Sequence, residues 1–223
     1  MIDLTILAAD KNMQFALHGA LNRPQAMGIR EITFEITTHP ERDGGMRTTR
    51  PLLLGLKRPR AKHGLLIFDY DGCGAKEPAD ELQARMDERL RPQWAANAKT
   101  VVVSPELDIW LWGGENALRE VLEWKKGGRI RDWLKKRGFC FAQTGKPERP
   151  KEAMDAIMRE LRVPRSSALY EKIAQKISLK RCVDPAFLCL KKQLQAWFPP
   201  PVSEGTDNQF SEEPKNYRPM NKS

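Results

Sequence analysis

The sequence predicts an α/β fold, with a parallel sheet of about four strands flanked by helices and a helical C-terminal extension. Two patterns support this prediction. Up to about residue 113, short apolar segments alternate with segments of helical periodicity, as they do in parallel sheets. The segment Leu65–Phe68 is apolar at every position, which is typical of a strand buried on both faces. Beyond residue 113 the patterns are helical.

The first half is expected to contain four strands, at Ile2–Ala9, Ile29–Thr37, Leu65–Phe68 and Thr100–Val103. Helices are expected between and after them, at Asp10–Leu21, Pro78–Leu90 and Pro105–Trp112. Asp10 is suited to cap the first of these helices, because its side chain can accept a hydrogen bond from a free backbone N–H. The polar segment His39–Gly45 is expected to be a loop, and a weakly patterned helix should follow it to about Lys57.

The second half is expected to contain four helices, at Val121–Trp133, Lys151–Leu161, Ser166–Ile177 and Asp184–Trp197. Three consecutive prolines at positions 199–201 end the last helix, and the polar remainder is expected to be disordered. These patterns predict an α/β domain at residues 1–113, a basic helical extension packed on it at residues 114–198, and a disordered tail at residues 199–223.

Composition excludes several classes of protein. Apolar residues make up 40% of the chain, which is enough for a core, and no apolar run reaches the ~18 residues that a membrane span needs. The first residues lack the basic region and cleavage site of a signal peptide. The four cysteines form no CxxC pair, which suits reduced thiols. We therefore expect a cytoplasmic protein that does not contact membranes.

The net charge of +9 is concentrated in two stretches of the second half. Arg119–Arg137 carries eight Lys or Arg residues against three acids, and Arg165–Lys192 carries seven against two. Concentrated positive charge attracts polyanions, so nucleic acid is the expected partner. The alternative is that these charges form ordinary solvated helix faces.

Acidic residues follow three of the four expected strands. Asp10 follows the first strand, Asp69 and Asp71 follow the third, and Glu106 and Asp108 follow the fourth. Because parallel strands place their carboxyl ends at one edge of the sheet, these side chains are expected to converge there. Gly72 and Gly74 allow a tight turn beside the Asp-x-Asp pair.

Neighbouring carboxylates repel each other unless a cation lies between them, so this pattern indicates a site for Mg²⁺ or Mn²⁺. The predicted metal ligands are Asp69, Asp71, Glu106 and Asp108. Each has a structural alternative. Asp69 and Asp71 could form a solvated turn, Asp10 could serve only as an N-cap, and the last two acids could stabilise a first helical turn.

Four basic residues are candidates for binding phosphate: Lys11, Lys146, Lys151 and Arg165. Lys146 and Lys151 flank a proline-rich segment that leads into a helix, and Arg165 precedes the start of another helix. Helix N-termini attract anions, and an arginine can bind phosphate through two parallel hydrogen bonds. The alternative is that these residues cap helices or lie on the surface.

Five sequence blocks together resemble an uncharacterised Toprim-like family: ADKNMQFAL, LLIFDYDGCG, SPELDIWLWG, KPERPKEAM and PRSSALY. They span roughly residues 4–198. The Toprim domain is shared by topoisomerases, primases and OLD-type nucleases. Members of the family that these blocks resemble occur in bacterial anti-phage operons, including the methylation-associated defence system.

The resemblance implies that Asp69, Asp71 and Glu106 hold Mg²⁺, as the Asp-x-Asp pair and the later acid do in Toprim enzymes. It also implies that Asp10 and Glu106 are the catalytic groups. In those enzymes the acid after the first strand is a glutamate that acts as general acid or base. This chain has Asp10 there, with Lys11 in place of the usual glycine, and a shorter carboxylate reaches less far towards a proton.

Two function hypotheses follow from the resemblance. The first is a Mg²⁺-dependent nuclease that acts on DNA or RNA. The second is a non-catalytic subunit that binds nucleic acid or an ATPase partner encoded in the same operon. A competing motif is that of haloacid-dehalogenase-type phosphatases, which also place Asp-x-Asp after an apolar strand. Those enzymes need a later strand that ends in another acidic pair, and the sequence after residue 113 does not supply one.

Overall fold

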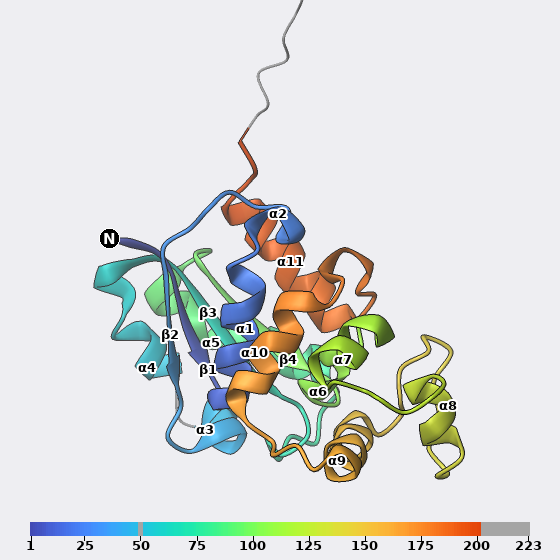
Figure 1. The fold of residues 1–223 in the computed structure, drawn as a ribbon. Helices are drawn as coiled ribbons and strands as arrows, with labels where there is room; N and C mark the ends of the chain where they lie inside the picture. Colours follow the sequence, from blue (N-terminus) through green and yellow to red (C-terminus); the bar gives the residue numbers. More distant parts are fainter. Residues whose placement is uncertain (49–50, 202–223) are drawn as a thin grey trace, which may run out of the picture.

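The computed structural model describes residues 1–48 and 51–201, and it contains a four-stranded sheet in which every pair of neighbouring strands is parallel. The strand order is β2-β1-β3-β4. The strands are β1 (Ile2–Ala8), β2 (Phe34–Thr38), β3 (Ala61–Asp69) and β4 (Ala98–Val103). The predicted fold class is therefore confirmed (Figure 1).

The two central strands, β1 and β3, are apolar because both faces of the sheet are covered. In their register Ile6 lies opposite Leu65, and Ala8 lies opposite Ile67. The side chains of Leu65–Phe68 are almost fully buried, as the uninterrupted apolar run predicts.

Eleven helices are present within the described ranges, together with two short 3₁₀ turns at Arg58–Arg60 and Leu179–Arg181. The helices are α1 (Lys11–Leu21), α2 (Pro24–Met27), α3 (Arg42–Thr48), α4 (Pro51–Gly55), α5 (Ala79–Trp94), α6 (Asp108–Leu111), α7 (Glu115–Val121), α8 (Ile130–Lys135), α9 (Pro150–Leu161), α10 (Ser167–Lys176) and α11 (Pro185–Trp197).

The helices form layers on the two faces of the sheet. Figure 1 shows α1 in front of the sheet, α10 in front of α1, and α5 behind the sheet. The crossing of α1 and α10 is close because Gly19 has no side chain: a Cβ there would lie 2.6 Å from the backbone oxygen of Glu171. Buried apolar side chains from both halves of the sequence form one continuous cluster.

Three helices of the second half follow the predicted ranges closely, and two of them begin at side-chain caps. The hydroxyl of Ser166 accepts a hydrogen bond from the N–H of Leu169, and Asp184 caps α11 through the N–H of Phe187. In the first half, Asp10 caps α1 as expected. Each cap supplies an acceptor that the first helical turn lacks.

One loop prediction and one helix prediction in the first half are wrong in their bounds. The segment His39–Gly45 is not all loop, because α3 begins at Arg42. The helix expected from Pro105 begins instead at Asp108. The reason is that residues 105–107 bond to the end of β3: the N–H of Asp71 donates to the oxygen of Pro105, and the N–H of Leu107 donates to Asp69.

The helix expected at residues 121–133 is also wrong, because two shorter helices, α7 and α8, replace it. The chain between them contains Gly127 and Gly128, and Gly128 adopts a φ of +83°, which a helix does not allow. The second strand is shorter than predicted, since regular pairing with β1 begins at Phe34.

Within residues 1–48 and 51–201, no helix has both the length and the apolar character needed to cross a membrane. The predicted boundary between residues 113 and 114 stays a prediction. Most of the tail predicted at residues 199–223 lies outside the described residues, which end at 201.

Candidate functional site

Four carboxylates lie at the carboxyl edge of the sheet, where the charges of the other three act on Asp69. Asp10 follows β1, Asp69 ends β3 and Glu106 follows β4, as the strand positions predict. The fourth, Asp43, comes from α3, which follows β2. We call these four residues the acidic cluster. Figure 1 shows this edge of the sheet beside α3.

Backbone N–H groups fix the orientation of three of these carboxylates. Asp43 Oδ1 accepts a hydrogen bond of 2.8 Å from the N–H of Asp69. Asp69 Oδ1 accepts one of 2.8 Å from the N–H of Leu107, and Asp10 Oδ1 accepts one of 2.9 Å from the N–H of Met13. Each of these bonds uses one carboxylate oxygen, so lone pairs of the acidic cluster remain for a ligand.

Burial and neighbouring like charges disfavour the ionised forms of Asp69 and Asp43. Burial raises the pKa of Asp69 well above its usual value, and the charge of Asp43 adds to this. The charges of Asp10 and Glu106 act in the same direction, while the N–H of Leu107 opposes them. Burial and then the charge of Asp10 also raise the pKa of Asp43, against the opposing hydrogen bond from Asp69. A cation bound here would relieve this repulsion.

Glu106 is buried and forms an ion pair with Lys151, whose Nζ lies 3.3 Å from Glu106 Oε2. Lys151 lies in the first turn of α9 and its side chain is half exposed. Burial raises the pKa of Glu106, and the charge of Asp108 raises it further, while Lys151 lowers it. The second half of the chain thereby places a positive charge directly at the acidic cluster.

Asp108 is held by groups from the second half of the chain. One nitrogen of Arg165 contacts both of its oxygens, at 2.7 and 2.9 Å, and the hydroxyl of Tyr170 donates to Oδ1 at 3.0 Å. Arg165 also donates to Asp155 at 2.8 Å. The side chain of Asp108 is only 6% exposed. These contacts link α6, α9 and α10. Asp108, predicted as a metal ligand, and Arg165, predicted to bind phosphate, are thus already paired with each other.

The remaining predicted residues lie in three different settings. Asp71 is exposed on the turn after β3, and Lys11 is exposed at the start of α1, beside Asp10. Lys146 is buried, with its Nζ 3.8 Å from the sulfur of Cys182. The structure therefore brings Asp10, Asp69, Glu106 and Lys151 together, and it places Lys146 elsewhere.

Asp43 is the member of the acidic cluster that the sequence analysis missed. The sequence does contain a signal for it, since it follows the second expected strand just as the other acids follow theirs. The classification of residues 39–45 as a loop obscured this signal.

The donor atoms of the acidic cluster suit Mg²⁺ or Mn²⁺, because hard divalent cations prefer carboxylate oxygens. In their present positions, however, no three His, Cys, Asp or Glu side chains of the described residues converge closely enough to hold a metal ion. The carboxylate oxygens therefore fit the predicted cofactor, but the carboxylates must move closer together before they can hold the ion.

Comparisons of this chain with protein-family models, with curated proteins and with solved structures found no match.

Proposed function

We propose that this protein is a Mg²⁺- or Mn²⁺-dependent nuclease that cleaves phosphodiester bonds in DNA or RNA. The observation that carries the proposal is the acidic cluster, in which burial and like charges raise the pKa of Asp69. Such clusters cost folding free energy and are typical of sites that bind a cation. Its place at the carboxyl edge of a parallel sheet is where α/β proteins bind ligands.

In this proposal Asp10, Asp43 and Asp69 hold the cation. When bound, it supplies a Lewis acid that polarises a phosphoryl oxygen and activates water. Glu106, the fourth member of the cluster, forms an ion pair with Lys151, whose Nζ lies 3.3 Å from its Oε2. Lys151 would bind a phosphate oxygen, and Lys11 would bind another, since both are exposed at this edge. Glu106, once released from Lys151 by the phosphate, would accept the proton of the attacking water. The water oxygen would bond to phosphorus as the bond to the leaving oxygen breaks, and the leaving oxygen would take up a proton from solvent.

The assignment to Toprim-like proteins and to anti-phage defence rests on the resemblance of the five sequence blocks. An ATPase or another product of the same operon is the partner that this resemblance suggests. The acidic cluster supports the chemistry and is independent of the biological setting.

The test is cleavage of supercoiled plasmid and of single-stranded DNA and RNA in the presence of Mn²⁺. We expect the wild type to cleave at least one substrate, and Asp69→Asn to lose that cleavage. Asn retains the acceptor for the N–H of Leu107, so the substitution removes charge with little change in hydrogen bonding. The matched control is Glu31→Gln, which removes an exposed acid outside the cluster. Cleavage that survives in Asp69→Asn would contradict the proposal.

A second candidate is a non-catalytic subunit that binds nucleic acid or an ATPase partner. The ion pair between Glu106 and Lys151 favours it, because that pair already neutralises one acid of the cluster. The presence of Lys11 where Toprim enzymes have glycine favours it too. This candidate predicts nucleic-acid binding by the wild type without cleavage under any metal condition.

A further inference from the structure

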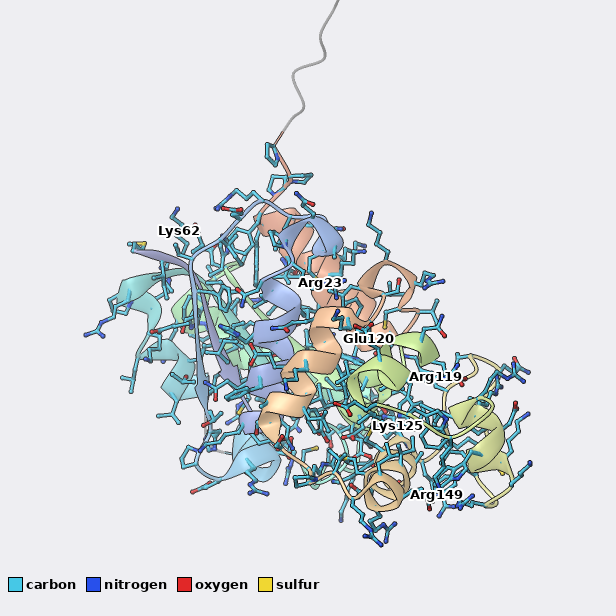
Figure 2. The ribbon with its side chains drawn as sticks, in the orientation of Figure 1. Arg23, Lys62, Arg119, Glu120, Lys125 and Arg149 are labelled. Carbon is cyan, nitrogen blue, oxygen red and sulfur yellow. The ribbon has the colours of Figure 1, made fainter. Side chains whose placement is uncertain are left out.

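The segment of residues 124–149 forms a strongly basic surface, which we call the basic module. It consists of α8 and its flanking loops. It contains nine Lys and Arg residues and two acids, Asp132 and Glu148. Figure 1 shows α8 at the side of the molecule, away from the sheet, and Figure 2 shows Lys125 and Arg149 on that side, with Lys62 on the opposite one.

Three arginines of the basic module lie over aromatic rings. The guanidinium carbon of Arg137 is 3.6 Å from the ring centre of Trp133, and that of Arg131 is 4.9 Å from the ring centre of Phe141. Arg149 lies 5.4 Å from the ring centre of Phe139. All three rings are partly exposed.

These pairs differ from the other three cation–π pairs of the described residues, in which the ring is buried: Phe198 lies under Arg30, Trp94 under Arg58 and Tyr170 under Arg165. Trp110 packs against Phe187 in the core, and the buried ring of Trp124 meets that of Trp133 in a T-shaped contact. Rings that are partly exposed and carry a guanidinium offer flat surfaces on which unpaired bases stack, with a positive charge beside each surface.

Some of the positive charge of the basic module is already paired. Lys126 and Arg137 both contact Glu160 of α9, and Arg129 contacts Asp132. Lys135 and Lys136 are exposed, and no ion pair joins either of them to another described residue. These two lysines are therefore available to phosphates.

The basic module continues directly into the candidate site. Residue 149 is followed by α9, whose first turn carries Lys151, the partner of Glu106. The ring nitrogen of Trp112 donates to the oxygen of Pro150 at 3.2 Å, which fixes this junction to the chain that follows α6. The end of the basic module therefore lies close to the acidic cluster.

We propose that the basic module binds single-stranded nucleic acid, stacking unpaired bases on Trp133, Phe139 and Phe141 and pairing phosphates with Lys135 and Lys136. The inference rests on the proposed function, which gives nucleic acid as the substrate. It adds that the substrate is single-stranded and that the basic module binds it. A duplex has its bases stacked inside and offers the rings only its backbone.

The test measures the binding of a fluorescent single-stranded oligonucleotide, and of the same sequence as a duplex, by anisotropy in EDTA. We expect the single strand to bind more tightly than the duplex at equal salt concentration. With the single strand, log K falls as log salt rises. Lys135→Gln combined with Lys136→Gln should make this slope less negative by about 1.4, because each phosphate contact contributes about 0.7. Lys180→Gln with Lys192→Gln, two exposed lysines elsewhere, should leave the slope unchanged.

The rings are tested by Phe139→Leu combined with Phe141→Leu. We expect at least about fivefold weaker binding of the single strand, since each stacked base contributes about 1–3 kcal/mol, with the salt slope unchanged. Equal or tighter binding of the duplex would overturn the proposal. So would unchanged binding by both the ring variant and the Lys135/Lys136 variant.

EDTA separates this proposal from the proposed function. If the predicted binding is found and no Mn²⁺ condition produces cleavage, the basic module stands and the nuclease proposal fails. If cleavage occurs and the basic-module variants bind normally, the nuclease proposal stands and the basic-module proposal fails.

Discussion

The backbone N–H of Asp69 donates a 2.8 Å hydrogen bond to Oδ1 of Asp43, which ties the end of β3 to the first turn of α3. This bond places a second carboxylate beside that of Asp69, where burial and the charge of Asp43 raise the pKa of Asp69 well above its usual value. The cluster is therefore held together by backbone hydrogen bonds while its charges repel one another.

The first prediction concerns pH. A carboxyl group whose pKa is raised by folding favours the protonated folded state, so its contribution to stability is present at low pH and is lost as pH rises through the raised value. Asn does not ionise, so Asp69→Asn removes this loss of stability at higher pH. In EDTA we expect the variant to be more stable than the wild type at about pH 7, and the difference to vanish near pH 4, close to the ordinary pKa of Asp. Melting temperatures of both proteins at several pH values measure this difference. A difference that stays the same from pH 4 to pH 7 would contradict the prediction.

The second prediction separates the charge of Asp43 from its hydrogen bond. Asp43→Asn keeps an acceptor for the N–H of Asp69 and removes a charge, so stability should be unchanged or higher. Asp43→Ala leaves that N–H without its acceptor, which should cost about 1–3 kcal/mol relative to Asn. Urea unfolding of both variants in EDTA measures the difference. Equal stability of the two variants would show that the hydrogen bond contributes nothing.

The third prediction concerns Arg165. Its removal leaves the buried carboxylate of Asp108 without its ion pair, so Arg165→Ala should destabilise the fold by roughly 3 kcal/mol. Tyr170→Phe removes one hydrogen bond to the same carboxylate and should cost about 1 kcal/mol. Denaturant unfolding gives both values. An Arg165→Ala variant as stable as the wild type would remove this residue from the structural network and return it to the phosphate-binding candidates.

The fourth prediction tests the packing of α1 against α10. In Gly19→Ala the new methyl group meets the backbone oxygen of Glu171 at 2.6 Å, so the helices must separate, at a cost of about 1–3 kcal/mol. The matched control is Gly44→Ala in α3, where a Cβ meets no atom within 4 Å. That substitution should raise stability by about 0.5–1 kcal/mol, because alanine favours helix over glycine. Thermal melts that rank the two variants in the opposite order would contradict the described packing.

The sequence predicts the central strands β1 and β3 well because an uninterrupted apolar run is a local signal of burial on both faces. The edge strand β2 is only partly buried, and its start was not predicted correctly. The caps at Asp10, Ser166 and Asp184 are equally local, and the helices that they begin were found. The segment at residues 105–107 could not be predicted, because its conformation depends on hydrogen bonds to the end of β3, a tertiary contact. The break between α7 and α8 does have a local signal, because the consecutive glycines Gly127 and Gly128 disfavour a helix interior.

The candidate site was predictable to the extent that strand ends determine it. Asp10, Asp69 and Glu106 share an edge because parallel strands require it. The partners of Glu106 and Asp108 were not predictable, since Lys151 in α9 and Arg165 in the loop after α9 lie 45 and 57 residues away from them in the sequence. The stacking pairs of the basic module depend in the same way on how its loops fold.

The most direct test of the account is the change in melting temperature on adding millimolar Mn²⁺ to protein prepared in EDTA. A cation bound only by the folded acidic cluster, at a concentration of about 100 times its Kd, should raise the melting temperature of the wild type by about 5 °C or more. Asp69→Asn should lose this increase, while Glu31→Gln should retain it. A wild type that melts at the same temperature in EDTA and in Mn²⁺ would contradict the claim that the acidic cluster is a metal site.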